Sequence, residues 1–332
     1  MTDRPIAALA MAPDVPDQVF PADLRERLSR SVRLAPTLLS GPPTDARARA
    51  TLAEAEILLT GWGCPRLSGD VLELAPRLRA VMHAAGSVRP VVSDALWERG
   101  IVVSSAADAN AGPVVAFTLA AVTFAGKKAL PAAARLAAGL GSGERPGADG
   151  RTIGIIGASR IGRRVIAALR ASDAGYRLLL TDPYVTDADA AEWGVERVEL
   201  PDLCRRSSIV SIHAPSLPET RGLVSAEMLK LIPDGGVVIN TARGALIDHE
   251  ALTRECADGR LDAYLDVTEP EPLPAGHPLY SLPNVLVTPH LAGALGSEVR
   301  RLGAYATAEV ERYLAGEPLQ GALRRQDMER MA

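Results

Sequence analysis

Short apolar runs alternate with stretches of helical spacing through most of the second half of the chain. We predict strands at residues 152–156, 177–181, 209–212, 237–240, 263–267 and 285–288. These runs are apolar at nearly every position rather than at every second one, which is typical of strands buried on both faces. Parallel sheets covered by helices have such strands, so the pattern predicts a doubly wound α/β domain.

The first third of the chain has a shorter alternation of the same kind. Its predicted strands are residues 57–60, 80–83 and 101–104, its predicted helices are residues 24–29 and 92–99, and the apolar run near the N-terminus is a further strand. With 332 residues and 47% hydrophobic content, the chain is long for one core and sufficient for two. We therefore expect a second, smaller α/β domain.

Three further segments complete the predicted organisation, and no internal repeat is visible. The longest apolar run, residues 114–125, follows Pro113 and predicts a buried helix that starts there and is too short to cross a bilayer. Residues 139–150 are rich in Gly, Ser and Pro and predict an exposed link between the two domains. A last helix is expected at residues 297–314, ended by Gly316.

Composition narrows the kind of protein. The formal net charge is -4, aromatic residues make up 4%, and Lys and Arg form no basic stripe, which argues against nucleic-acid binding and favours a small soluble substrate. The N-terminus lacks the layout of a signal peptide. Cys64, Cys204 and Cys256 are far apart and have no CxxC or His partners, so we expect buried thiols in a reducing cytoplasm, without disulfides or a metal site.

A glycine-containing turn follows the strand at residues 152–156. Gly157 suits a tight turn and Gly162 suits close packing of the following helix, as in dinucleotide sites where the helix N-terminus binds the pyrophosphate. The position expected to hold the middle glycine holds Ser159. Its side chain either points away or donates its hydroxyl to a phosphate oxygen, and both readings predict weakened but retained binding.

Asp182 ends the next predicted strand. A carboxylate at this place accepts hydrogen bonds from the adenosine ribose and repels a 2′-phosphate, so the sequence favours NAD over NADP. The alternative is that Asp182 only forms a turn before Pro183.

An arginine, two candidate carboxylates and a histidine each follow an apolar strand. Arg243 carries a planar, permanently charged guanidinium that can bind a carboxylate with two hydrogen bonds and polarise an adjacent keto oxygen. His290 can protonate that oxygen, and a carboxylate from Glu269 or Glu271 can orient the imidazole. This combination suits reduction of a 2-keto acid to a 2-hydroxy acid.

The order and the local amino-acid sequences of these segments closely resemble those of the D-isomer-specific 2-hydroxyacid dehydrogenase family, which includes glycerate, D-lactate, phosphoglycerate, formate and phosphite dehydrogenases. The match is dense from Gly154 to Gly293 and sparse before Ala106. The resemblance implies a Rossmann domain for NAD at residues 106–290. It also implies a flavodoxin-like substrate domain made of residues 1–105 and 291–332, with a cleft between the domains.

The resemblance also assigns roles to residues. It selects Glu271 over Glu269 as the partner of His290, and it places His213 beside the cofactor rather than as the proton donor. The implied catalytic set is Arg243, Glu271 and His290. The implied cofactor-binding set is Gly157, Ser159, Arg160, Ile161, Gly162, Asp182, His213, Thr241, Ala242, Asp266 and Gly293, with Asp266 and Gly293 near the nicotinamide amide. The implied substrate-binding set is Ala85, Gly86 and Ser87 together with Arg243.

The resemblance implies an NAD-dependent enzyme that interconverts a D-2-hydroxy acid and its 2-keto acid, with glyoxylate or hydroxypyruvate as the commonest kind of substrate. A homodimer without metal, nucleic-acid or membrane partners is expected. Two alternatives remain, a phosphite dehydrogenase-like oxidoreductase and a non-catalytic NAD(H)-sensing protein. Three residues depart from the pattern or have open roles: Arg89, either an ion-pair partner or a second anion contact; Ala116, where a glutamate is usual; and Trp62, either core or cleft.

Overall fold

The computed structural model describes residues 4–329 except 142, 144 and 145, and it contains two compact units. One unit extends to Gly112 and resumes at Ala294, and the other is Pro113–Gly293. The sequence placed the corresponding boundaries after residues 105 and 290. Each unit is an α/β body whose sheet is parallel except for one short edge strand of the first unit, so the predicted fold class is confirmed.

The first unit has a sheet of order β13-β5-β4-β3-β1-β2. Its strands are β1 (Ile6–Ala10), β2 (Arg33–Leu34), β3 (Ile57–Thr60), β4 (Ala80–His83), β5 (Val102–Ser105) and the antiparallel β13 (Ala322–Leu323). The five parallel strands have the flavodoxin-like order. Two apolar clusters flank the sheet. Helices α1 (Pro16–Val19), α2 (Ala22–Ser31) and α13 (Arg300–Ala315) contribute to one cluster, and α3 (Ala46–Glu54), α4 (Gly69–Glu73) and α5 (Asp94–Glu98) to the other.

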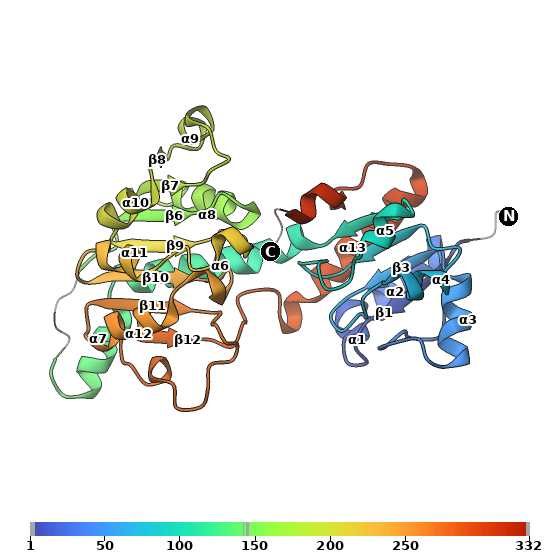
Figure 1. The fold of residues 1–332 in the computed structure, drawn as a ribbon, viewed down its shortest axis with the longest axis horizontal. Coiled ribbons are helices and arrows are strands. Elements are labelled where there is room, and N and C mark those ends of the chain that lie inside the picture. The colour runs from blue at the N-terminus through green and yellow to red at the C-terminus, as the bar shows by residue number, and fades with distance from the viewer. Residues whose placement is uncertain (1–3, 142, 144–145, 330–332) are drawn as a thin grey trace. The chain divides into compact units, whose positions relative to one another are not determined.

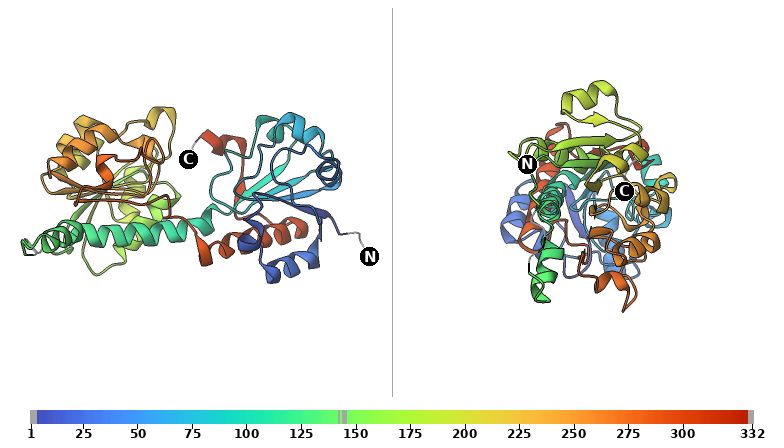
Figure 2. Two further views of the ribbon diagram at one scale, coloured as in Figure 1. Left: turned by 90° about the horizontal axis from the view of Figure 1, so that it is seen from below. Right: turned by 90° about the vertical axis from the view of Figure 1, so that its left-hand side faces the viewer.

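The second unit has a sheet of order β12-β11-β10-β9-β6-β7-β8, all parallel, which is the order of a Rossmann fold. Its strands are β6 (Thr152–Ile156), β7 (Arg177–Thr181), β8 (Glu196–Arg197), β9 (Ile209–Ile212), β10 (Gly236–Asn240), β11 (Leu261–Leu265) and β12 (Val285–Val287). Helices cover both faces (Figure 2). They are α6 (Ala107–Gly126), α8 (Arg160–Arg170) and α9 (Asp187–Trp193) on one face, and α10 (Leu200–Arg206), α11 (Ala226–Leu231) and α12 (His249–Ala257) on the other.

The predicted strands are confirmed with small shifts, but two predictions about connections were wrong. Helix α6 begins at Ala107 rather than after Pro113, because the small residues before the proline continue the helix despite its missing N–H. With 20 residues, α6 is long and apolar enough to span a membrane, yet Ala121, Val122 and Ala125 pack in the core of the second unit. The described residues of the segment 139–150 lie inside the second unit, between α7 (Ala129–Ala137) and β6, and not between the two units.

Candidate active site

The three residues predicted to be catalytic follow neighbouring strands of the second unit. Arg243 follows β10, Glu271 follows β11 and His290 follows β12, and these strands are parallel neighbours whose carboxyl ends share one edge. The Nδ1 atom of His290 is hydrogen-bonded to Oε1 of Glu271 at 2.6 Å. Their side chains are 48% and 42% exposed, so both groups remain accessible. Glu269 instead forms an ion pair with Arg221 at 3.1 Å. The structure therefore pairs His290 with the glutamate that the resemblance selected.

Arg243 lies close enough to Glu271 for their charges to interact. Burial lowers the pKa of its guanidinium, and the Glu271 carboxylate opposes that shift through its negative charge. The guanidinium stays charged, since no such shift brings an arginine near neutral pH. The structure thus brings a cation, a carboxylate and an imidazole together within one unit.

Asn240 shapes the turn that carries Arg243, and the sequence analysis did not single it out. It ends β10 and is fully buried. Its Nδ2 donates to the carbonyl of Arg243 at 2.8 Å, and its Oδ1 accepts from the amide of Ala242 at 3.0 Å. The sequence did contain a signal for this role, because the amide side chain comes directly after the apolar residues of a predicted buried strand. A buried amide needs hydrogen-bond partners, so the signal predicts bonds to the adjacent turn.

The glycine turn after β6 has the geometry that a dinucleotide site needs. Gly157 has φ +93°, and a Cβ there would lie 2.6 Å from the amide nitrogen of Ala214. A Cβ at Gly162 would lie 2.1 Å from the Gly157 carbonyl oxygen, so α8 packs directly on the turn. The turn lies between β6 and β9, where the strand order reverses, which is where such folds bind nucleotides. These residues fit a bound dinucleotide.

Ser159 is the N-cap of α8. Its φ of −60° needs no glycine, and its Oγ accepts from the amide of Gly162 at 3.4 Å. Because the oxygen accepts this bond, the hydroxyl proton is still able to donate to a phosphate oxygen. Arg160 and Ile161 form the first turn of the same helix. The serine therefore replaces the expected glycine without strain.

Asp182 and His213 border this turn. The Asp182 carboxylate accepts from the amide of Ala158 at 2.7 Å and from that of Tyr184 at 2.8 Å, so it fixes the turn itself. Lone pairs remain on both oxygens for ribose hydroxyls. His213 follows β9, shares a hydrogen bond with Ser211 Oγ at 2.9 Å, and is buried. Burial lowers its pKa to about 4, so the imidazole is neutral at ordinary pH.

The other residues expected to bind the cofactor lie at the same edge of the second unit's sheet. Thr241 follows β10, and its Oγ1 is 3.1 Å from that of Thr118 in α6. Ala242 precedes Arg243, while Asp266 directly follows β11. Gly293 follows the His290 segment and ends the unit. The order of the strands therefore places this group beside the catalytic residues.

The expected substrate loop, Ala85 to Ser87, belongs to the first unit and follows β4. Ser105 Oγ donates to the carbonyl of Gly86 at 2.9 Å. His83, at the end of β4, is hydrogen-bonded to Thr60 Oγ1 at 2.8 Å and also to the backbone of Ser87. Burial lowers the pKa of His83 to about 4. A neutral buried histidine therefore braces the loop.

The structure shows what surrounds two of the residues whose roles the sequence left open. The Arg89 guanidinium donates to the carbonyl of Met328, which ties it to the C-terminal segment of the first unit. Trp62 is 42% exposed and is not a core residue. The structure gives no role to Ala116.

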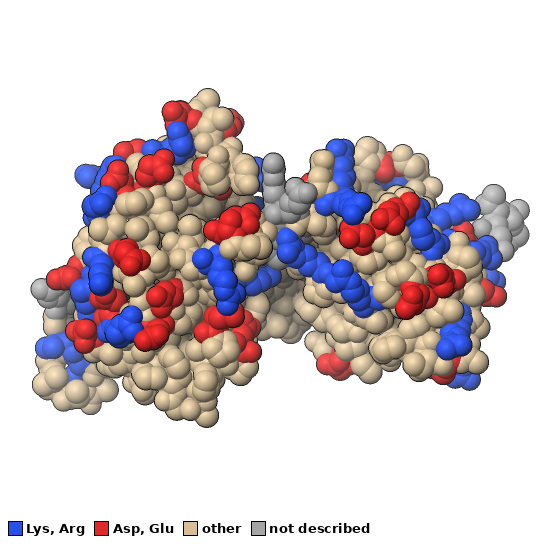
Figure 3. All heavy atoms as spheres, in the orientation of Figure 1, with Lys and Arg blue, Asp and Glu red and all other residues tan. Residues whose placement is uncertain are grey.

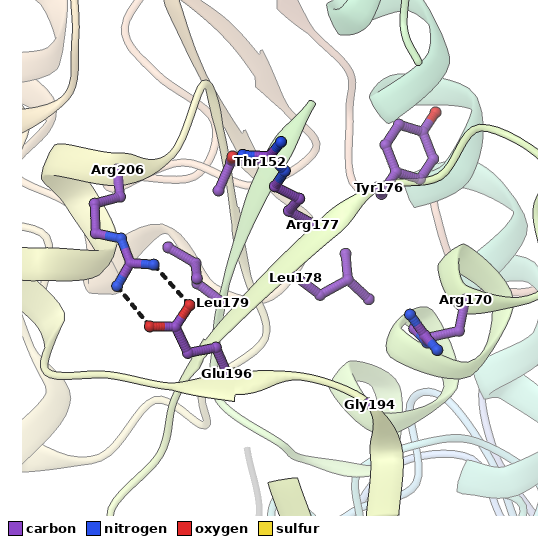
Figure 4. A pocket seen from close by; sticks show the side chains of 9 residues that line it. All are labelled: Thr152, Arg170, Tyr176, Arg177, Leu178, Leu179, Gly194, Glu196 and Arg206. Atoms are coloured by element: carbon purple, nitrogen blue, oxygen red, sulfur yellow. Dashed lines mark hydrogen bonds and ion pairs between the residues drawn. The ribbon is translucent and has the colours of Figure 1, made fainter. Parts of the chain in front are cut away.

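A pocket of about 560 Å³ lies elsewhere on the second unit (Figure 4). Thr152 and Arg177 begin β6 and β7, so the pocket is at the amino edge of the sheet, opposite the glycine turn. The two terminal nitrogens of Arg206 reach the Glu196 carboxylate at 2.7 and 2.6 Å. Arg170 and Arg206 end α8 and α10, where positive charge stabilises the helix dipole. This pocket is therefore not part of the candidate site.

Comparisons with known proteins agree with these observations. The model of the D-isomer specific 2-hydroxyacid dehydrogenase NAD binding domain matches residues 132–292. A glyoxylate reductase of Aeropyrum pernix is 32% identical over 90% of this chain and 91% of its own length. A D-3-phosphoglycerate dehydrogenase of Methanocaldococcus jannaschii is 32% identical over 80% of this chain and 51% of its own. The crystal structure of a phosphoglycerate oxidoreductase from Rhizobium etli aligns with a TM-score of 0.79 and 25% identity, covering 97% of this chain and 98% of the other.

The chain belongs to the D-isomer-specific 2-hydroxyacid dehydrogenase family, as its residues predicted. The match also confirms the predicted NAD-binding domain. This chain spans about half the length of the phosphoglycerate dehydrogenases that it matches, and most of the length of the glyoxylate reductase.

Proposed function

We propose that this protein is an NAD-dependent oxidoreductase that interconverts a D-2-hydroxy acid and its 2-keto acid. The observation that carries the proposal is the contact of 2.6 Å between His290 Nδ1 and Glu271 Oε1, with Arg243 close enough to Glu271 for their charges to interact. All three groups stand at the sheet edge that also carries the dinucleotide turn. This arrangement combines an anion anchor, a proton donor and a cofactor site.

In the reductive direction, the Arg243 guanidinium binds the substrate carboxylate and polarises the keto oxygen. NADH, when bound, supplies the hydride that reduces the keto carbon. His290 donates a proton to the keto oxygen, so that one keto acid, one NADH and one proton give one hydroxy acid and one NAD⁺. Glu271 holds the ring through Nδ1 and stabilises the imidazolium, which leaves Nε2 as the atom that transfers the proton.

Asp182 supports a preference for NAD over NADP. Its carboxylate borders the glycine turn and would repel a 2′-phosphate at the ribose. The other assigned cofactor contacts are the amides of Arg160 and Ile161 at the start of α8, and the residues around Thr241 and Gly293. We expect the amides of Ala85, Gly86 and Ser87 to contact the substrate carboxylate.

Glyoxylate and hydroxypyruvate are the proposed substrates, supported by the similarity to a glyoxylate reductase over nearly the whole chain. The test is NADH oxidation, followed by absorbance, with a panel of glyoxylate, hydroxypyruvate, pyruvate, oxaloacetate and bulkier 2-keto acids, and with NADPH as control. Oxidation by one or more acids supports the proposal. Measurable NADH binding without any turnover would refute it in favour of phosphite oxidation or NAD(H) sensing.

We also propose a cytoplasmic homodimer. Large apolar side chains are exposed on α6, on α7 and just after it, namely Phe124, Leu136 and Leu140, and α7 has no buried residue. A second copy of the chain would cover them. Sedimentation of the wild type and of Leu136→Asp tests the dimer, and we expect the variant to sediment as a monomer.

The surface charge bears on the kind of partner. On the face in Figure 3, acidic and basic side chains are interspersed over the second unit, which favours a small-molecule partner.

A further inference from the structure

Asp266 is a buried carboxylate directly after β11. It is 2% exposed, and its amide donates to the carbonyl of Asn240 at 2.9 Å. Its Oδ1 accepts from Thr288 Oγ1 at 2.6 Å and from the amide of Leu291 at 2.8 Å, and its Oδ2 accepts from the amide of Ala292 at 2.9 Å. Every one of these side-chain contacts goes to the segment on either side of His290. One carboxylate thus fixes that whole segment.

The backbone at His290 shows why such fixing is needed. His290 has φ +52°, a left-handed conformation that a side chain other than glycine seldom adopts. Its amide donates to the carbonyl of Asp266 at 2.9 Å. A strained conformation of this kind costs on the order of 1–3 kcal/mol and persists only where its surroundings determine it. Asp266 supplies hydrogen bonds to the residues before and after the strained position and to the strained residue itself.

The carboxylate has little capacity left for another role. An ionised carboxylate offers roughly four lone-pair directions, and three are occupied by Thr288, Leu291 and Ala292. The expected contact with the nicotinamide amide would therefore use the one that remains, on Oδ2. Most of the hydrogen-bonding capacity of Asp266 is directed at the His290 segment.

We propose that Asp266 is a positioning residue, which holds His290 in the left-handed conformation that presents its ring to Glu271. The proposal rests on the proposed function only in so far as His290 is the proton donor. Positioning to within about 1 Å is worth up to roughly 100-fold in rate for a group in a transition state. Loss of this carboxylate therefore lowers kcat more than it lowers NADH affinity.

The test replaces Asp266 with asparagine, which keeps the size of the side chain. In Asp266→Asn, one acceptor oxygen becomes an NH₂ group that faces an N–H or O–H donor of the His290 segment. The matched control is Asp262→Asn, because Asp262 is also a buried carboxylate of β11 but pairs with Lys128 at 2.8 Å. If Asp266→Asn fails to fold, Thr288→Val removes one of the three side-chain bonds and replaces it as the test variant.

Two readouts are measured on each variant. The first is kcat with the best 2-keto acid together with the Kd of NADH. The second is the ¹⁵N spectrum of histidine-labelled protein without cofactor or substrate, in which the signal of His290, one of only 5 histidines, is assigned with His290→Asn. The Nδ1 signal reports the hydrogen bond to Glu271 and requires no turnover. It therefore decides the positioning role even if the proposed function fails.

The proposal predicts a fall in kcat of about 100-fold in Asp266→Asn and a changed Nδ1 signal, with a much smaller change in the Kd of NADH. Asp262→Asn keeps the wild-type signal and kcat. Thr288→Val changes the signal in the same direction with a smaller loss of kcat. A wild-type Nδ1 signal in Asp266→Asn, or in Thr288→Val if that variant alone folds, would overturn the proposal. Loss of NADH affinity at normal kcat would do the same, because it would assign Asp266 to the cofactor.

Discussion

Replacement of Gly162 by alanine is the sharpest test of the dinucleotide turn. The added Cβ would lie 2.1 Å from the carbonyl oxygen of Gly157 and 3.3 Å from Cβ of His213. Real contacts of this kind essentially never fall below 3.0 Å, so the N-terminus of α8 or the turn must move by about 1 Å. Alanine also favours a helix by about 1 kcal/mol over glycine, whereas overpacking costs typically 1–3 kcal/mol. The gain offsets the cost only in part, which leaves a net loss of up to about 2 kcal/mol in stability.

The effect on cofactor binding is not offset, because the moved amides are those expected to bind the pyrophosphate. We predict that the Kd of NADH rises at least about tenfold in Gly162→Ala, which corresponds to about 1.4 kcal/mol. The assay is titration of NADH fluorescence, with circular dichroism to confirm folding. The control is Gly69→Ala at the start of α4, where the nearest atom to the new Cβ is Ala95 Cβ at 4.0 Å. Wild-type NADH affinity in a folded Gly162→Ala would refute the proposed role of the turn.

Three further predictions concern single residues. His213 has a pKa of about 4 in the folded state against 6.5 as the ordinary value, so its stabilising contribution is complete above pH 6.5 and is lost as the pH falls toward 4. In urea unfolding, the wild type should lose more free energy of unfolding between pH 7.5 and pH 5 than His213→Gln does, by about 2 kcal/mol. Equal losses in the two proteins would contradict the burial argument. Arg243→Lys should raise KM for the keto acid and lower kcat in steady-state kinetics, since an ammonium cannot bind a carboxylate with two parallel bonds; unchanged constants would remove Arg243 as anchor. Ser159→Gly should lower the Kd of NADH by calorimetry while costing a few tenths of a kcal/mol in helix capping, and a Kd that stays equal or rises would show that the serine does not weaken binding.

The strands and the residues that follow them were predictable because their signals are local. Continuous apolar runs revealed buried parallel strands, and polar residues within three positions of their ends included Asp182, Arg243 and His290. Parallel strands bring their carboxyl ends to one edge, so the sequence alone indicated that these residues gather there. The choice of Glu271 over Glu269 came only from the family resemblance, because both precede a proline in the same loop.

Other features depend on contacts between distant segments, which a local pattern does not contain. The bond of Asp266 to Thr288 and to the amides after His290 joins two loops. The left-handed backbone of His290 lies between these bonds, and the residues next to it in the sequence give no sign of it. The start of α6 was also mispredicted. Proline favours the first turn of a helix, but in the structure the residues before Pro113 already belong to the same helix.

The central claim is that His290 moves the proton in a reaction anchored by Arg243. The most direct measurement compares kcat and KM of the wild type, His290→Ala and Arg243→Ala with the best 2-keto acid and NADH. We predict that His290→Ala lowers kcat by about 10²- to 10⁴-fold with little change in KM, whereas Arg243→Ala raises KM and lowers kcat together. Turnover of His290→Ala close to that of the wild type would contradict the claim.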